Sequence, residues 1–192
     1  MPTPDILISI ALGIGLAAAT GLRVFLPLLV MSIAAYSGHL TLGADFHWLA
    51  SLPALLMLAV AALLEVAAYY VPGLDNLLDA VATPAALLAG TIAAAAVLTD
   101  LPPLVKWATA FIAGGGAAGL TQGVTALLRA KSTLGTGGLA NPVIATGELG
   151  GAAGLSLLAI AAPILALCLV VLACWAVVKI VRRLLPHKPS AR

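Results

Sequence analysis

Apolar residues fall into five long stretches that are separated by short polar segments. The stretches cover residues 6–36, 48–71, 80–99, 107–128 and 149–178. A helix needs about 20 apolar residues to cross the hydrocarbon core of a bilayer, and each stretch reaches that length. The pattern predicts an all-α fold, a polytopic bundle of transmembrane helices.

The last stretch, at 30 residues, is too long for one straight span. It predicts two spans that turn near Ala161, Ala162 and Pro163. The alternative is a single tilted helix with a kink at the proline, because proline removes a helical hydrogen bond. We favour two helices here, which makes six spans rather than five.

Composition supports a membrane protein. Hydrophobic residues make up 62% of the 192-residue chain and charged residues 8%, against about 25% charged in soluble domains. Residues 1–192 are therefore predicted to form one membrane domain. The N-terminus lacks the basic segment and cleavage site of a secretory signal, so the first apolar stretch is expected to remain. Without a nucleophile elbow, a phosphate loop or a zinc motif, we expect no enzyme activity and no cofactor.

Basic residues predict the orientation. Arg129 and Lys131 flank one connection, and a basic tail covers residues 179–192, whereas the loop over residues 37–47 has no lysine or arginine. The positive-inside rule assigns the first two places to the cytoplasm. Six spans then put both termini in the cytoplasm, and the expected location is a bacterial inner membrane. Nucleic acid is an unlikely partner for this chain because no basic domain is present to hold it.

Two halves of the chain show weak internal similarity. Residues 15–20 (GLAAAT) resemble residues 116–121 (GAAGLT), but the spacing to the following shared elements differs. A real repeat would divide the chain into residues 5–99 and 104–185, with three spans in each half. An odd number of spans makes the halves inverted, as in many small transporters. The alternative is that an Ala- and Gly-rich composition produces the match.

Each half also carries a place where a helix can break. Thr20 and Gly21 form one, next to Arg23, and Thr121 and Gln122 form the other, between Gly119 and Gly123. Broken helices expose backbone groups that bind ions or solutes near the midplane. The alternative for the glycines, which we favour, is close packing of helices, because Gly115 and Gly119, or Gly147, Gly151 and Gly154, have the spacing that lets helices touch.

The first polar cluster holds three carboxylates. Glu65 and Tyr69 share a helical face, and Asp75, Asn76 and Asp79 follow after a turn. Carboxylates with neutral oxygens between them are typical of a hard-cation site. The alternative assigns Asp75 to a helix cap, Asp79 to the first helical turn and Glu65 to an ion pair with Arg23.

The second polar cluster contains Asn141 and Glu148. Asn141 before Pro142 predicts a helix cap, which puts Glu148 about 9 Å into a span. A carboxylate at that depth must be protonated, paired or coordinating. Arg23 is permanently charged and needs an anion, which one of these acids, a lipid phosphate or a substrate can supply. One positive group against at least two negative ones favours a cation or proton, with Arg23 as a clamp for a substrate carboxylate as the alternative.

The loop between the first two stretches carries two histidines, His39 and His47, on either side of Asp45. This arrangement permits metal capture. We favour the alternative, an interfacial loop that is anchored in the bilayer by Phe46 and Trp48.

Several of these motifs, taken in order, resemble one known family, the bacterial membrane proteins of domain of unknown function 4126. The residues that carry the resemblance are Thr20, Gly21, Arg23, Phe25, Pro27, Pro72, Asp75, Asn76, Asp79, Gly114, Gly116, Asn141, Pro142 and Glu148. The resemblance covers residues 6–183. It implies a multi-span membrane protein and does not imply any particular activity.

These features favour a small secondary transporter or channel-like protein for a cation or small solute, with proton coupling as an option. A structural or lipid-binding protein, whose charges only lock helices together, is the alternative. An intramembrane enzyme that acts on lipid ranks third. A homodimer would complete a pathway in so small a chain.

Overall fold

The computed structural model of the chain describes residues 4–71 and 74–184, apart from the side chains of residues 4, 74–77, 79, 180–181 and 183–184. These residues form helices and no strand. The helices are α1 (Pro4–Thr20), α2 (Phe25–Tyr36), η1 (Ala44–Ala50), α3 (Leu52–Tyr69), α4 (Leu74–Val97), α5 (Pro103–Thr109), η2 (Ala110–Gly115), α6 (Gly116–Thr136), α7 (Asn141–Ala161) and α8 (Pro163–Leu184).

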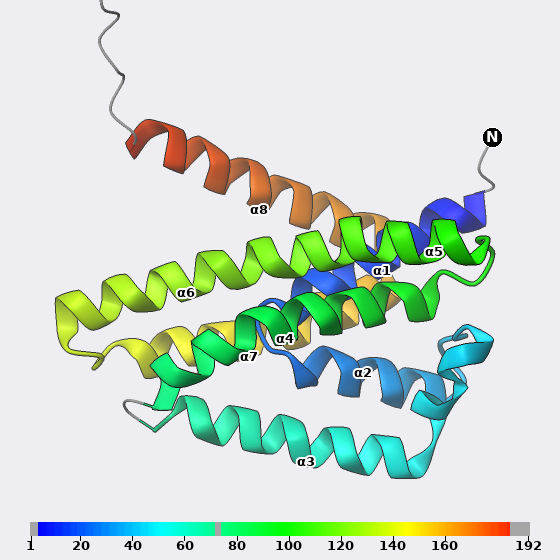
Figure 1. Cartoon of the computed structure of the whole chain (residues 1–192), viewed down its shortest axis with the longest axis horizontal. Helices are drawn as coiled ribbons and strands as arrows, with labels where there is room; N and C mark the ends of the chain where they lie inside the picture. Colours follow the sequence, from blue (N-terminus) through cyan, green and yellow to red (C-terminus); the bar gives the residue numbers. More distant parts are fainter. Residues whose placement is uncertain (1–3, 72–73, 185–192) are drawn as a thin grey trace, which may run out of the picture.

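The first apolar stretch forms a helical hairpin instead of the single predicted span. Helix α1 ends at Thr20, the chain reverses, and α2 begins at Phe25 and runs back toward the end from which α1 came (Figure 1). The tip of this hairpin lies inside the bundle. The predicted helix break at Thr20 and Gly21 is therefore confirmed, and it separates two short helices of 17 and 12 residues.

Four helical segments of the described chain are long and apolar enough to cross a membrane. They are Leu52–Tyr69, Ala80–Val97, Pro103–Thr136 and Asn141–Ala161. The predicted turn near Ala161 is confirmed, since α7 ends there and α8 begins at Pro163. Six spans and two inverted repeats are not confirmed: α1, α2, α3 and α4 lie in the first half, whereas the second half holds the α5–η2–α6 segment, α7 and α8.

The second predicted helix break is wrong. Helices α5, η2 and α6 form one continuous rod over Pro103–Thr136, and Thr121 and Gln122 lie inside it (Figure 1). The irregular backbone lies earlier, in the π-helical turn η2. There Gly114 packs directly on Gly90 of α4, so close that a Cβ on Gly114 would lie 2.8 Å from the Gly90 carbonyl oxygen.

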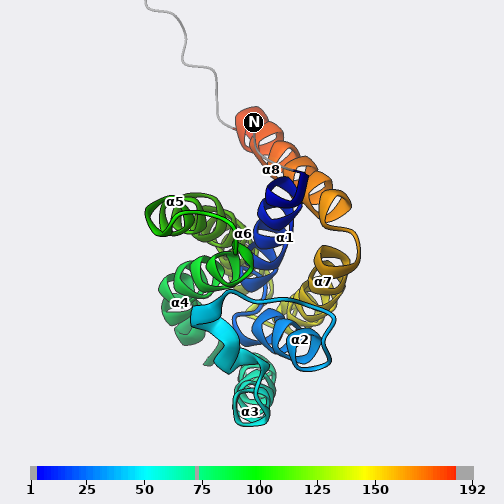
Figure 2. The same cartoon turned by 90° about the vertical axis from the view of Figure 1, so that its right-hand side faces the viewer.

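Small residues hold the bundle together at its centre. Helix α1 packs against α4, α7, α8 and α6, and Figure 2 shows it surrounded by these helices. At the hairpin tip, a Cβ on Gly21 would overlap the carbonyl oxygen of Ala118 in α6. Close backbone contact is how helices associate in lipid, where apolar burial gives no driving force. The close-packing interpretation is thus confirmed for Gly115 and Gly119, where a Cβ would lie 2.7 Å from Thr91 and 2.6 Å from Leu87, but not for Gly147.

The outward faces of the helices are largely apolar, unlike the surface of a water-soluble protein. Large apolar side chains face outward on the helices, as Leu63 does with 70% of its surface exposed, whereas Arg23 is 1% exposed. This surface suits hydrocarbon, and the described helices are those of a membrane protein.

The first and last described helices begin and end at opposite ends of the bundle. Figure 1 shows α1 starting at one end of the long axis and α8 running toward the other. The prediction that both termini share the cytoplasmic face is not confirmed. Residues 185–192 of the predicted basic tail lie outside the described residues.

Candidate functional site

Arg23 lies at the tip of the hairpin, between α1 and α2, and is buried. Its Nη2 donates a hydrogen bond of 2.9 Å to the carbonyl oxygen of Ala145 on α7. The same nitrogen lies 3.4 Å from Oε2 of Glu148, one helical turn further along α7. The break in the first apolar stretch thus positions a permanent positive charge against a carboxylate that is itself only 6% exposed.

A second guanidinium reaches the same carboxylate oxygen. Arg129 of α6 forms an ion pair with Oε2 of Glu148 and is 2% exposed. The prediction that Arg129 flanks a cytoplasmic connection is wrong, since α6 continues for seven residues beyond it. The spacing of Ala118, Gln122, Thr125 and Arg129, which form the buried face of α6, was the signal that could have placed it inside.

Tyr69, near the C-terminal end of α3, packs against both guanidinium groups. The Cζ atoms of Arg23 and Arg129 lie 3.9 and 4.0 Å from the centre of its ring. A ring face attracts cations, most strongly where water is excluded. We call Arg23, Arg129, Glu148 and Tyr69 the arginine cluster; its members come from the hairpin tip, α6, α7 and α3.

Some polar atoms of the arginine cluster have no hydrogen-bond partner among the described residues. They are Nε and Nη1 of Arg23 and Oε1 of Glu148, all buried. An ionised carboxylate can accept about four hydrogen bonds, whereas Glu148 is held through a single oxygen that two guanidiniums share. The cluster is therefore buried and paired but incompletely coordinated.

Glu65 anchors the hairpin through the backbone. Its Oε1 accepts a hydrogen bond of 2.7 Å from the Val24 N–H, and its Oε2 accepts one of 3.0 Å from the Phe25 N–H. These groups begin α2, where N–H groups lack helical partners and the helix dipole favours a negative charge. Glu65 also lines a groove of about 460 Å³ between α3 and α4. Glu65 therefore caps α2 instead of forming an ion pair with Arg23, which was the predicted alternative.

The other predicted polar residues take local roles. Asn141 is the first residue of α7, and instead of capping that helix its Nδ2 donates a 3.0 Å hydrogen bond to Thr133 of α6. Thr20 and Thr121 donate to carbonyl oxygens of their own helices, at Ala17 and Ala117. The side chains of Asp75, Asn76 and Asp79, predicted to supply a cation site, lie outside the described part of the chain.

The histidine loop forms no metal site among the described residues. Asp45 pairs instead with the buried Lys106 of α5, whose Nζ lies 3.1 Å from Oδ2. His47 hydrogen-bonds to the Leu42 carbonyl oxygen. Of the two predicted interfacial anchors, Trp48 is exposed but Phe46 is buried, with its ring centre 5.1 Å from Lys106 Nζ.

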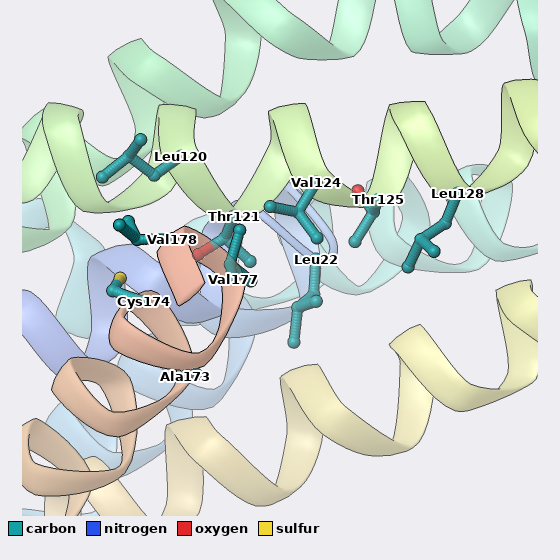
Figure 3. Close-up of a pocket in the computed structure, with 10 residues that line it drawn as sticks. All are labelled: Leu22, Leu120, Thr121, Val124, Thr125, Leu128, Ala173, Cys174, Val177 and Val178. Atoms are coloured by element: carbon teal, nitrogen blue, oxygen red, sulfur yellow. The ribbon is translucent and has the colours of Figure 1, made fainter. Parts of the chain in front are cut away.

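An apolar groove runs beside the hairpin tip, between α6 and α8. It has a volume of about 320 Å³, and Figure 3 shows Leu22, the neighbour of Arg23, together with Thr121, Val124 and Cys174 around it. The charged side chains of the arginine cluster do not line this groove. One residue of the tip thus faces an apolar groove while the next faces the buried charges.

A comparison with family models identifies the family of the chain. A model described as a domain of unknown function (DUF4126) matches residues 10–183. The chain belongs to this family. The matched region includes the hairpin, the arginine cluster and most of α8, so the family resemblance of the sequence motifs is confirmed. No curated protein and no solved structure matches the chain.

Proposed function

We propose that the chain is a small secondary transporter or channel-like membrane protein for a small polar solute or ion, with the arginine cluster as its solute-handling site. The observation that carries this proposal is the hairpin, which ends inside the bundle and presents Arg23 to Glu148. Discontinuous helices that meet within the membrane are the usual setting of transporter sites, because their ends supply polar groups at depth.

Incomplete coordination supports a working site over a purely structural one. A buried charge pair that only locks helices is most stable when every polar atom is satisfied. Arg23 Nε, Arg23 Nη1 and Glu148 Oε1 have no hydrogen-bond partner in the described part of the chain. The two Arg23 nitrogens can donate hydrogen bonds to a solute or water, and Glu148 Oε1 can accept one.

The second arginine changes the charge argument for the solute. The argument from sequence set one positive group, Arg23, against at least two carboxylates and therefore favoured a cation. The arginine cluster instead joins both Arg23 and Arg129 to Glu148, while Glu65 accepts hydrogen bonds from the backbone at the start of α2. The described charges therefore no longer favour a cation over an anion.

The competing function is helix locking, and the deep burial of Arg23, Arg129 and Glu148 favours it. In that case the cluster would fasten the hairpin to α6 and α7 without moving any solute. For either function we propose a bacterial inner membrane as the location, surrounding lipid as the partner, no catalysis, and a homodimer as the assembly.

Flux through proteoliposomes tests the proposal. Purified protein is reconstituted, and uptake of protons, sodium, potassium, magnesium, acetate, phosphate and chloride is compared for wild type, Glu148→Gln and Asp45→Asn. We expect flux of at least one solute in wild type and a fall of about tenfold or more in Glu148→Gln. Asp45→Asn, which breaks an ion pair outside the cluster, is the control that should behave like wild type. An absence of flux for every solute, together with loss of stability in Glu148→Gln, would contradict transport of these solutes and favour helix locking.

A further inference from the structure

The structure points to Glu148 as an internal stand-in for the true ligand of Arg23 and Arg129, which we infer to be a small oxyanion such as a carboxylate or phosphate. This inference rests on the proposed function, since the oxyanion would be the solute. It names the solute class, which the composition and charge of the chain do not.

The guanidinium of Arg23 is only partly used by Glu148. Nη2 meets both Ala145 O and Glu148 Oε2, while Nε on one side and Nη1 on the other have no acceptor among the described residues. A guanidinium offers its donors in planar pairs that match the two oxygens of a carboxylate or phosphate. If Glu148 withdraws, Nη2 together with either neighbour forms such a pair.

Glu148 is held in a way that allows exchange. Both arginines contact its Oε2, and its Oε1 lacks any donor in the described residues. A free oxyanion could take the same place and use more of its oxygens. Exchange would also keep the charge of the site constant, because one negative group replaces another and the arginines never face each other uncompensated.

Burial makes the site selective for anions whose lost hydration the arginines can replace with charge-assisted hydrogen bonds. Arg23 and Arg129 are almost fully buried, and the ring of Tyr69 lies within 4.0 Å of both Cζ atoms. A cation that entered here would meet two positive charges in a weakly screened interior. An oxyanion would gain charge-assisted hydrogen bonds in the same place.

Removing the stand-in should strengthen binding. When a site is open for only a fraction of the time, the apparent affinity falls by that fraction. If Glu148 occupies the site at least nine-tenths of the time, Glu148→Gln should bind phosphate or acetate about tenfold more tightly than wild type. Tighter binding and slower release also explain why flux is expected to fall in the same variant.

Thermal unfolding of the full chain in detergent tests the inference, with sodium phosphate or sodium acetate replacing sodium chloride at constant ionic strength. We expect phosphate or acetate to raise the unfolding temperature of Glu148→Gln at about tenfold lower concentration than that of wild type. Chloride should do less, because it lacks the two oxygens that match a planar pair of guanidinium donors. Arg23→Gln combined with Glu148→Gln, which removes one charge of each sign, should not respond.

The outcomes separate the two proposals. Equal responses of wild type and Glu148→Gln, or an equal response of the double variant, would overturn the oxyanion site. If Glu148→Gln fails to fold in buffer without phosphate but folds when phosphate is present throughout purification, this rescue supports the site. If phosphate does not rescue folding, the site is overturned. Oxyanion binding without flux would support the oxyanion site and contradict transport. Cation flux that depends on Glu148 without oxyanion binding would contradict the site and leave transport standing.

Discussion

Arg23 and Lys106 are both buried basic residues paired with an acid, yet their settings differ. Glu148, the partner of Arg23, is 6% exposed, whereas the side chain of Asp45, the partner of Lys106, is 75% exposed. Lys106 therefore pairs with an acid at the surface, whereas Arg23 pairs with an acid that is buried beside it. A pair with one member in a polar medium contributes little, while a pair enclosed on both sides cannot lose a member without leaving a buried charge.

The largest effect should follow from removing the enclosed carboxylate. Glu148→Ala leaves two guanidiniums without the acid they share, and we expect a loss of about 3–5 kcal/mol in the free energy of unfolding. Denaturation in mixed micelles measures this loss. Ser156→Ala is the matched control on the same buried face of α7, because it removes a polar atom without a charge. Equal losses in the two variants would show that the cluster is not special.

An intermediate effect is expected at Glu65. The Glu65→Gln substitution leaves one amide oxygen to accept from two backbone N–H groups, and it removes the negative charge from the start of α2. We expect a cost of about 1–3 kcal/mol, together with faster hydrogen exchange at the amides of Val24 and Phe25.

Tyr70→Phe provides the comparison for Glu65→Gln. It removes the exposed hydrogen bond between α3 and Thr146 and should cost less than Glu65→Gln. Unchanged exchange at Val24 and Phe25 in Glu65→Gln would contradict the role of Glu65 as a cap.

The smallest effect should come from the exposed pair. Asp45→Asn keeps a polar partner for Lys106, and we expect about 0–1 kcal/mol, with a difference from wild type that shrinks as salt is added. Unfolding measured at low and high ionic strength checks this expectation. A cost that equals that of Glu148→Ala would remove the contrast between the two pairs.

Much of the fold could be predicted from local pattern. The apolar stretches located α3, α4 and the rod α5–η2–α6, and the glycine beside Thr20 marked the real break. The break near Gly119 was wrong because glycine is compatible with a helix in a membrane when a neighbour packs closely on it. Hydropathy also could not show that the chain turns back after Thr20, since a hairpin and a span contain the same residues.

Only part of the site could be predicted from the sequence. Arg23 and Glu148 were noticeable because single charges interrupt or adjoin apolar stretches. Arg129 was missed because it lies near Lys131 and thus looked like part of a basic flank, although its neighbours Gln122 and Thr125 share its buried face. Which acid meets which base depends on how helices far apart in sequence pack, and no local pattern contains that information.

The hairpin also sets an order for biosynthesis. Arg23 is made 122 residues before Ala145, whose carbonyl oxygen it contacts, and at about 5–20 residues per second the delay is roughly 6–24 s. Glu65, which caps α2, appears 41 residues after Val24 and is therefore available much earlier. During the interval the tip of the hairpin has its cap but not its ionic partners. We therefore expect the newly made chain to complete this end of the bundle only when α7 joins it, so that the hairpin tip, although made early, is among the last parts to reach its final contacts.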